Sequence, residues 1–331
     1  MFTQRRRRRS PAALLAAAAA VAVAAAATAE IAARLLLHPD ALVYRDSADP
    51  KLGFELLPGA RGVKSGVPVS INAQGMRDDP VAAAKPAGQR RVVVVGGQQA
   101  FGVGVPVAQT FVREAAQGLK VPGRVRTLNL SMYSYDLAQK VELACDRLES
   151  LQPDVVVLQA SDDDAGSLPP PAVRAPRVKN WLREHSVLAR WAAERRYLRR
   201  SETAVPAAPS APDAAAEESS ARDQLRRFAD CVKAAGARGL VMMISDPVGD
   251  GKPSPTALGL ESEAKALKLP YFDAGPAIRR LPASERLLTP NAPFLSPDAQ
   301  RAAAEALKRA LRPMLLEPAP KPKAPKPRPS V

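Results

Sequence analysis

From residue 89 onward, continuous runs of apolar residues alternate with segments that have helical spacing. Buried strands are predicted at 91–96, 124–130, 154–160, 239–245 and 270–273. Helices are predicted between them at 107–119, 136–151 and 258–267. Ser296 followed by Pro297 indicates the start of a last helix, which reaches about residue 312. Strands that are apolar on both faces and alternate with helices form a parallel sheet covered on both sides.

This pattern predicts an α/β fold, a three-layer αβα sandwich around a five-stranded parallel sheet. Right-handed crossovers between consecutive strands give the flavodoxin-like strand order 2-1-3-4-5. A lead-in segment at 40–88, with a strand-like run at 67–72, precedes the domain, which we place at 89–312. Sites in such sheets lie at the carboxyl ends of the strands. The residues that follow the strands are therefore the first candidates for chemistry.

The N-terminal region carries a targeting or anchoring pattern. Five arginines at 5–9 precede an uncharged, alanine-rich run at 10–29, which has the roughly 20 residues that cross a bilayer. The run is either an uncleaved transmembrane anchor at 10–37 or a signal peptide cleaved after Ala29, and its length favours the anchor. Because flanking arginines stay cytoplasmic, both interpretations place the rest of the chain outside. It is then anchored on the periplasmic side of an inner membrane or, after cleavage at Ala29, secreted.

A long insertion at 167–221 interrupts the alternation, and a helix is predicted within it at 178–198. One stripe of that helix carries Trp181, His185, Leu188, Ala192 and Leu198. We interpret the stripe as a face that docks on the domain, with a basic face lying against anionic lipid as the alternative. The composition of 201–220 predicts disorder, as does that of the Pro- and Lys-rich tail at 313–331.

The formal net charge of +15 does not by itself indicate a nucleic-acid partner. Arginines at 5–9 and the C-terminal tail carry a large part of it. Much of the remainder lies at 174–200, where nine Lys and Arg residues accompany two Glu residues. Because no aromatic-interleaved binding motif accompanies these charges, we expect no nucleic-acid partner.

Cys145 and Cys231 both fall in predicted helices. Two cysteines do not define a disulfide framework, although an oxidising compartment permits a bridge. We expect two buried free thiols.

The end of the first strand carries the most informative motif, VVVVGGQQAFGVGVP at 92–106. Dinucleotide and P-loop sites are excluded here, because neither G-x-G-x-x-G nor Gly-Lys-Ser/Thr is present. The segment resembles the first block of the SGNH (GDSL-type) hydrolases, in which a strand leads into G-D-S-x-T-x-G-x-G-V-P. In that family the serine of the tight turn is the nucleophile.

Four further segments resemble the same family in the same order. INAQGMRD at 71–78 resembles the I-N-x-x-G-x-R-D motif of membrane-anchored members. LNLSMYSY at 128–135 resembles the second block, N-x-G-x-x-G, and PDVVVL at 153–158 resembles the third, P-D-x-V-V-x before N-D. NAPFLSPD at 291–298 resembles the last block, D-x-x-H-L-S-P-E-G. The resemblance covers about residues 45–312 and implies the SGNH hydrolase fold and an ester-directed site.

The positions that carry the chemistry of that family are different in this chain. Gln98 stands at the nucleophilic serine, and Asn291 and Phe294 stand at the acid and base of the last block. The oxyanion glycine of the second block corresponds to Ser134, or to Ser131 in a shifted register.

The third-block asparagine corresponds to Asp162, whose charge would repel an oxyanion. The chain has two histidines, His38 beside the apolar run and His185 in the insertion, and neither lies in these motifs.

We therefore expect a catalytically inactive, SGNH-like domain outside the cytoplasm that binds or positions a cell-envelope ligand, by analogy an acylated glycan. Two alternatives stay open: an active esterase or acyltransferase with a rearranged site, and a membrane-tethered scaffold protein. We expect no metal and no cofactor, and the sequence indicates no oligomeric state. The candidate ligand-binding residues are Gly97, Gln98, Gln99, Ser131, Ser134, Tyr135, Asp162, Asp163 and Asn291.

Overall fold

The computed structural model describes residues 11–36, 41–165, 182, 186–189, 191–192, 214–289 and 292–317. The chain divides into two compact units, Met1–Pro39 with Arg174–Ala207, and Asp40–Val173 with Ala208–Val331. The arginines at 5–9, most of the helix predicted at 178–198, the stretch 201–213 and the tail from 318 lie outside the described residues.

The larger unit is built on a five-stranded sheet in which every neighbouring pair is parallel. Its strands are β5 (Gln89–Val95), β6 (Arg124–Asn129), β7 (Val155–Ser161), β8 (Arg238–Ile244) and β9 (Tyr271–Asp273). The spatial order is β6-β5-β7-β8-β9. The predicted strands and their predicted order, second-first-third-fourth-fifth, are therefore confirmed.

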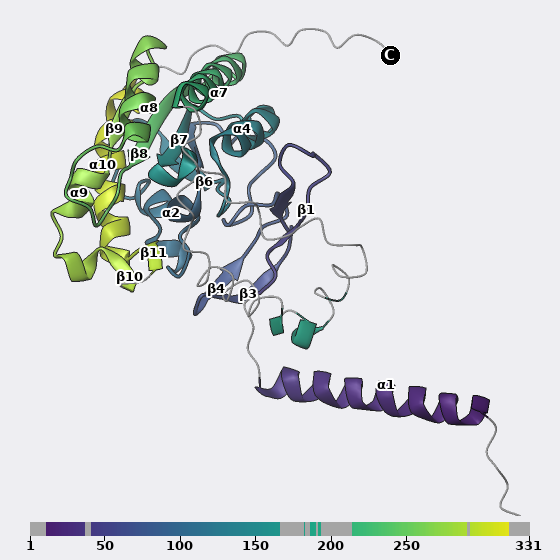
Figure 1. Ribbon diagram of the computed structural model, residues 1–331. Coiled ribbons are helices and arrows are strands. Elements are labelled where there is room, and N and C mark those ends of the chain that lie inside the picture. The colour runs from purple at the N-terminus through teal and green to yellow at the C-terminus, as the bar shows by residue number, and fades with distance from the viewer. Residues whose placement is uncertain are drawn as a thin grey trace, which may run out of the picture. The chain divides into compact units, whose positions relative to one another are not determined.

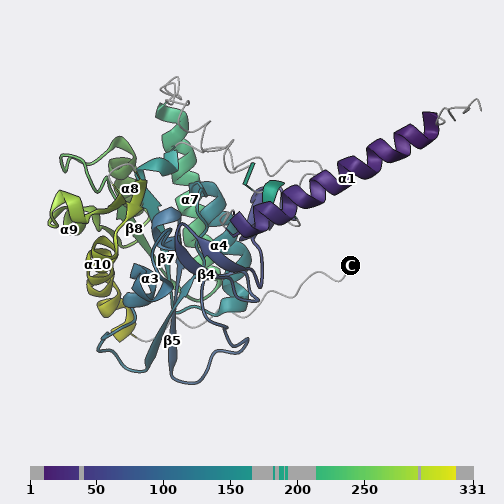
Figure 2. The ribbon, with the colours of Figure 1, turned by 90° about the horizontal axis from the view of Figure 1, so that it is seen from below.

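Helices cover both faces of this sheet, so the unit is a three-layer α/β sandwich (Figures 1 and 2). One layer holds α3 (Phe111–Glu114), α9 (Gly275–Arg279) and α10 (Pro297–Leu316). The opposite layer holds α4 (Leu137–Leu151), α7 (Ala214–Ala234) and α8 (Pro255–Ala266). Short helices occupy the connections: α2 (Gln98–Phe101), η1 (Val107–Gln109), η2 (Asp162–Ala165) and η3 (Ala283–Glu285).

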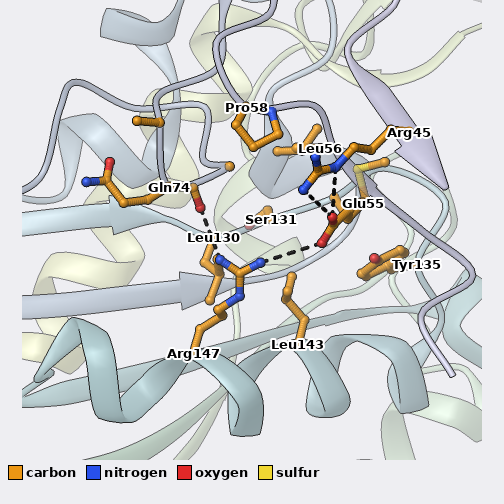
Figure 3. A pocket seen from close by; sticks show the side chains of 13 residues that line it. Arg45, Glu55, Leu56, Pro58, Gln74, Leu130, Ser131, Tyr135, Leu143 and Arg147 are labelled. Atoms are coloured by element: carbon orange, nitrogen blue, oxygen red, sulfur yellow. Dashed lines mark hydrogen bonds and ion pairs between the residues drawn. The ribbon is translucent and has the colours of Figure 1, made fainter. Parts of the chain in front are cut away.

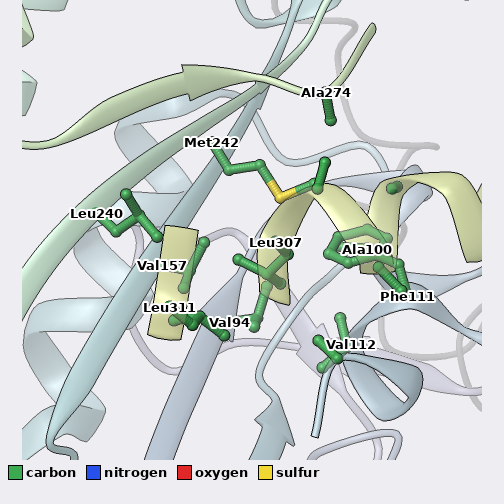
Figure 4. Close-up of a cluster of buried hydrophobic side chains, with 14 of the residues drawn as sticks. Val94, Ala100, Phe111, Val112, Val157, Leu240, Met242, Ala274, Leu307 and Leu311 are labelled. Carbon is green, nitrogen blue, oxygen red and sulfur yellow. The ribbon is translucent and has the colours of Figure 1, made fainter. Parts of the chain in front are cut away.

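Alternation along β5 divides the core into two faces, because successive side chains of a strand point to opposite sides. Val92 and Val94 pack under α10, where they meet Leu307 and Leu311 (Figure 4). Val93 and its neighbours on the other face pack under α4 and the lead-in segment. Both faces of β5 are buried, which explains why the strand reads as a continuous valine run.

The lead-in segment forms two antiparallel hairpins and completes one side of the core. β1 (Tyr44–Asp46) pairs with β2 (Phe54–Leu56), and β3 (Arg61–Lys64) pairs with β4 (Val67–Ser70). Its buried side chains, among them Phe54, Ile71 and Met76, join the cluster around Val93 and Leu128. A third hairpin, β10 (Leu287–Thr289) with β11 (Ala292–Leu295), leads into α10.

Two predicted helices have different bounds in the structure. The helix predicted at 107–119 is broken, because Thr110 is extended and caps a new helical turn through the Arg113 N–H. The last helix does not end near residue 312 but continues through Pro313 to Leu316. Burial of Met314 and Leu315 holds this final turn in place, despite the backbone hydrogen bond that a proline cannot make.

The disorder predicted for 201–220 is wrong for its last part, because 214–220 form the first turns of α7. Alanine and glutamate are strong helix formers, and farther along this helix Leu225, Phe228 and Val232 bury its apolar stripe. Helix α7 is thus the crossover between β7 and β8.

The expectation of two free thiols is also wrong. Cys145 on α4 and Cys231 on α7 form a disulfide, with their Cα atoms 5.4 Å apart. The two helices lie side by side in the same layer of the sandwich, which brings the two half-buried cysteines together. The bond closes a loop with a sequence separation of 86 residues.

The smaller unit contains α1 (Pro11–Leu36), which is long and apolar enough to cross a membrane. Its most apolar window has a mean hydropathy of 2.2 and none of it is buried within the structure. Such a helix is a membrane anchor or a signal sequence, as the sequence predicts.

Candidate functional site

The first block forms a tight turn at the carboxyl end of β5. Gly96 must lack a side chain, because a Cβ there would lie 2.5 Å from the Gln159 Oε1. The same oxygen accepts a hydrogen bond from the Gly97 N–H at 3.0 Å. Gln98 then starts α2, and Gly102 ends it with a φ of 77°, in the left-handed region that glycine adopts freely. The glycines of this motif therefore shape the backbone.

Arg77, from the lead-in motif, holds this turn from below. Its guanidinium donates to the carbonyl oxygens of Phe101 at 2.7 Å, Gly102 at 2.5 Å and Val105 at 2.6 Å. The side chain is 1% exposed, and burial lowers its pKa from 12.5 to about 10. The buried charge is offset by these three hydrogen bonds, which give donors to the carbonyls of Phe101 and Val105 and a second donor to Gly102, whose oxygen also accepts from the Val105 N–H.

Two more elements fix the turn from other sides. Asn129, at the end of β6, donates to the Ala100 carbonyl at 2.8 Å. Gln300 of α10 donates to the Gln99 carbonyl at 3.0 Å and accepts from the Phe111 N–H at 2.8 Å. Because three separate elements converge on the turn, its conformation is set by the whole domain.

The rest of the lead-in motif supports the same region. The Asn72 Oδ1 accepts from the N–H groups of Gln74 and Met76, each at 3.0 Å. Asp78 accepts from the Asn129 N–H at 3.0 Å. Asp78 also pairs with two arginines, which oppose the effect of burial that raises its pKa. Residues of the I-N-x-x-G-x-R-D motif thus hydrogen-bond to both of the first two blocks and stabilise their positions.

In the second block, the structure separates residues that face the edge of the sheet from residues of the interior. Ser134 is half-exposed and has a φ of 63°, the conformation expected where the family has glycine. Ser131 is fully buried and donates to the Val94 carbonyl at 3.3 Å. Tyr135 is buried and donates to the Phe54 carbonyl, and burial raises the pKa of its phenol. Of these three candidates, Ser134 is thus the one whose side chain is partly exposed, whereas Ser131 and Tyr135 are buried and line the cavity described below.

Asp162, in the third block, forms hydrogen bonds with the loop that connects β8 to α8. Its carboxylate accepts from the Asp246 N–H at 2.7 Å and from the Ser254 hydroxyl. Ser254 in turn caps α8 by accepting from the Ala257 N–H. Asp162 thus ties β7 to the start of α8. The side chain of Asp163 lies outside the described residues.

A buried ion pair that the sequence motifs do not indicate lies next to Gly97. Lys140 is 0% exposed, and its Nζ lies 2.5 Å from the Oδ1 of Asp164. The other oxygen of Asp164 accepts from the Ser161 N–H at 3.0 Å. A Cβ at Gly97 would lie 3.3 Å from the Lys140 Nζ. The Lys140 ammonium therefore lies next to Gly97, the position that corresponds to the aspartate of the G-D-S motif.

The helical periodicity of the sequence indicates that this lysine is buried. Position 140 falls on the apolar stripe of α4, among Leu137, Val141, Ala144 and Leu148. A charge on a buried stripe requires a partner, although the sequence alone does not say which one.

A second polar cluster joins the ends of β8 and β9. Ser245 is 2% exposed, and its hydroxyl donates to Asp273 at 2.6 Å. Arg279 donates to the same hydroxyl at 3.0 Å and to the Asp246 carbonyl at 2.8 Å. The serine proton is directed at a carboxylate and its lone pair is used by a guanidinium. The cluster is therefore built to hold two strand ends together.

The last block lies against the first. Phe294, on β11, is half-exposed and packs against the cluster that contains Phe101 and Met132, and β11 contacts α2. Ser296 caps α10 through the Ala299 N–H, as predicted. Asn291 lies outside the described residues. The structure thus brings the hairpin that carries Phe294 against the short helix that begins at Gln98.

A cavity of about 170 Å³ lies beside the second block, between the lead-in segment and α4 (Figure 3). Glu55 at its rim pairs with Arg45 at 2.7 Å and with Arg147 at 3.6 Å. Arg147 also donates to the Gln74 carbonyl at 3.2 Å. These charged groups pair with one another across the opening, so they tie the lead-in segment to α4. Gln98 does not line this cavity.

Metal binding has no set of ligands in the described part of the chain. No group of three or more His, Cys, Asp or Glu side chains is close enough there to hold an ion.

Several solved structures resemble this chain. TesA is 17% identical over 68% of this chain and 100% of that chain, with a TM-score of 0.45. A lipase/acylhydrolase from Enterococcus faecalis is 15% identical over 71% of this chain and 100% of that chain, with a TM-score of 0.42. A member of the lipolytic protein G-D-S-L family from Veillonella parvula is 10% identical over 65% of this chain and 94% of that chain, with a TM-score of 0.40.

No family model and no curated protein matches the chain. The Veillonella parvula protein is described as a member of the G-D-S-L family, the family that the sequence motifs resemble.

Proposed function

We propose that the larger unit is a non-hydrolytic, SGNH-like binding domain, held on the outer side of a membrane by α1. The observation that carries this proposal is Gln98. Hydrogen bonds from Arg77, Asn129 and Gln300 fix the turn at which the SGNH motif has its nucleophile. At that position this chain has the carboxamide of Gln98. An amide side chain has no hydroxyl or thiol to add to an ester carbonyl.

The surroundings of Gln98 support the same conclusion. Phe294 stands where the family has its base, and a phenyl ring accepts no proton. The carboxylates near this edge, on Asp162, Asp164 and Asp273, each accept hydrogen bonds from the protein itself. Ser134 has a hydroxyl at the edge, but nucleophilic catalysis also needs a base within hydrogen-bond reach.

The ligand class we propose is an acylated glycan of the cell envelope. Gln98 carries an amide and Ser134 a hydroxyl, and Tyr133 and Phe294 are half-exposed aromatic side chains. Tyr133 packs edge-on against Phe101 at 5.4 Å, which fixes its ring next to the turn. Uncharged polar groups beside aromatic surface suit a neutral, hydroxyl-rich ligand.

Binding is tested by thermal unfolding of the purified chain with an O-acetylated oligosaccharide and with its deacetylated form. The acetylated form is expected to raise the Tm, and above the Kd this increase should grow with the logarithm of the ligand concentration. Gln98→Ala should abolish the shift, whereas Gln117→Ala, at an exposed glutamine on the surface, should retain it. A Tm that neither sugar changes, or an equal shift in the Gln98 variant, refutes this ligand class.

The disulfide supports the proposed location. Disulfides persist outside the cytoplasm and are rare within it, and arginines flanking an apolar helix stay cytoplasmic. Thiol alkylation of denatured protein taken directly from cells should label neither Cys145 nor Cys231 unless a reductant is added first. Full labelling without reductant would place the domain in the cytoplasm.

The same bond gives a stability prediction. Replacing both Cys145 and Cys231 by serine is expected to lower the free energy of unfolding by roughly 4 kcal/mol, because the bond closes a long loop. Urea denaturation measures the change.

A further inference from the structure

The smaller unit contains a contact between the apolar helix α1 and the insertion. Glu30 lies near the end of α1, and its carboxylate accepts hydrogen bonds from the insertion. The donors are the Ser186 hydroxyl at 2.8 Å, the Val187 N–H at 2.9 Å and the Leu188 N–H at 3.3 Å. Arg34, one turn later, donates to the same carboxylate at 2.9 Å.

The contact depends on the helical conformation of the insertion at this point. Residues 187–189 are helical, and the first N–H groups of a helical segment lack partners within it. Glu30 supplies the acceptor for two of them, while the Ser186 hydroxyl accepts from the Ala189 N–H at 3.0 Å. Val187 and Ala33 are buried, at 8% and 4% exposure, although the apolar window of α1 is otherwise bare. The insertion is therefore tied to α1 by packing as well as by hydrogen bonds.

The position of Glu30 along α1 coincides with the expected surface of a bilayer. Glu30 follows Pro11 by nineteen residues, which spans roughly 28 Å at 1.5 Å per residue. The hydrocarbon core of a bilayer is about 30 Å thick. A helix that starts its crossing near Pro11 thus leaves the hydrocarbon close to Glu30, and whatever Glu30 holds lies at the interface.

The segment held by Glu30 has the composition of an interfacial element. Leu182 and Leu188 are exposed, and both tryptophans of the chain, Trp181 and Trp191, are close to them in the sequence. Tryptophan concentrates at membrane interfaces. Between 174 and 200 the sequence carries nine Lys and Arg residues against two Glu residues, a charge that anionic headgroups attract.

We propose that Glu30 holds the insertion on the outer surface of the bilayer that α1 crosses, and that the partner of the insertion is anionic phospholipid. The proposal rests on α1 remaining in the protein as an anchor. It does not depend on what the edge of the sheet binds.

Intrinsic tryptophan fluorescence tests this directly, because both tryptophans lie in the segment concerned. The full chain is reconstituted into vesicles of equal parts phosphatidylcholine and phosphatidylglycerol. A lipid spin-labelled near the headgroup should quench the emission more than one labelled near the end of the acyl chain. Vesicles of phosphatidylcholine alone should give weaker quenching.

Three variants separate the contribution of the Glu30 contact from general effects. Glu30→Ala should lose most of the lipid quenching and shift the emission to longer wavelength. Arg34→Ala, which removes an ion pair but leaves the three bonds to the insertion, should behave as the unaltered chain does. Leu188→Ser should weaken the quenching without abolishing the Glu30 contact.

Three results overturn the proposal. The first is emission that aqueous iodide quenches and neither lipid label does. The second is a blue-shifted emission that neither quencher reaches, which would mean that the segment is buried in protein. The third is a mass of the reconstituted chain that shows cleavage after Ala29, since α1 would then be absent.

Discussion

The turn after β5 and the hairpin before α10 lie against each other at one edge of the sheet, yet the chain treats them differently. In the turn, Gly96 and Gly102 leave no room for a Cβ, Gly102 also has a left-handed φ, and Arg77 donates to the backbone carbonyls. At the positions meant for chemistry, Gln98 and Phe294 offer neither a nucleophile nor a base. The chain thus keeps the residues that support the turn, although it lacks reactive groups at the positions where the SGNH motifs carry them.

The largest effect is expected at the support of the turn. Arg77→Leu removes the donor to three buried carbonyls, so the free energy of unfolding should fall by roughly 3 kcal/mol or more. Urea denaturation measures this loss. Arg301→Leu, at an exposed ion pair with Asp298 on α10, is the control and should change the stability by less than about 0.5 kcal/mol. Similar losses in both variants would mean that Arg77 does not support the turn.

An intermediate effect is expected at the backbone of the turn. Gly102→Ala combines a left-handed φ of 77° with a Cβ that would lie 2.4 Å from the Thr110 Cγ2, and should cost about 2–3 kcal/mol. Gly66→Ala has a φ of 79° but no atom within 4 Å of the new Cβ, and should cost about 1 kcal/mol. The difference between the two Tm changes measures the close approach of Thr110.

The smallest effect on stability is expected at Gln98, the position that corresponds to the nucleophilic serine of the SGNH motif. Gln98 is half-exposed at the start of α2, so Gln98→Ala should alter the free energy of unfolding by less than about 0.5 kcal/mol. Chemical denaturation of this variant beside Arg77→Leu gives the comparison directly. A loss above about 1.5 kcal/mol would make Gln98 a structural residue and remove the reason to treat it as part of a binding surface.

Most of the fold could be predicted from local patterns. Five continuous apolar runs predict five buried strands, and their alternation with helices predicts the parallel order. The errors occur where distant segments decide the outcome. Cys145 and Cys231 pair because α4 and α7 lie side by side, which no local pattern reports. Helix α10 passes Pro313 because Leu315 is buried against the sheet.

The candidate site was predictable in its position but not in its support. Strand ends indicate where Gln98 and Ser134 lie, and the motif spacing matches the left-handed φ of Ser134 to a glycine position. The roles of Arg77 and Lys140 depend on contacts across the fold, with Phe101 and Asp164. Sequence periodicity can mark a buried charge, but only the tertiary structure names its partner.

Hydrolysis of p-nitrophenyl acetate by the purified full chain tests the central claim most directly. Loss of a nucleophile and its base removes several orders of magnitude in rate, so the account predicts no turnover above a heat-denatured control. Gln98→Ser should not create activity, because no base is placed to activate the new hydroxyl. Robust turnover by the unaltered chain, abolished by Ser131→Ala, Ser134→Ala or His185→Ala, would contradict the account and reveal a relocated catalytic site.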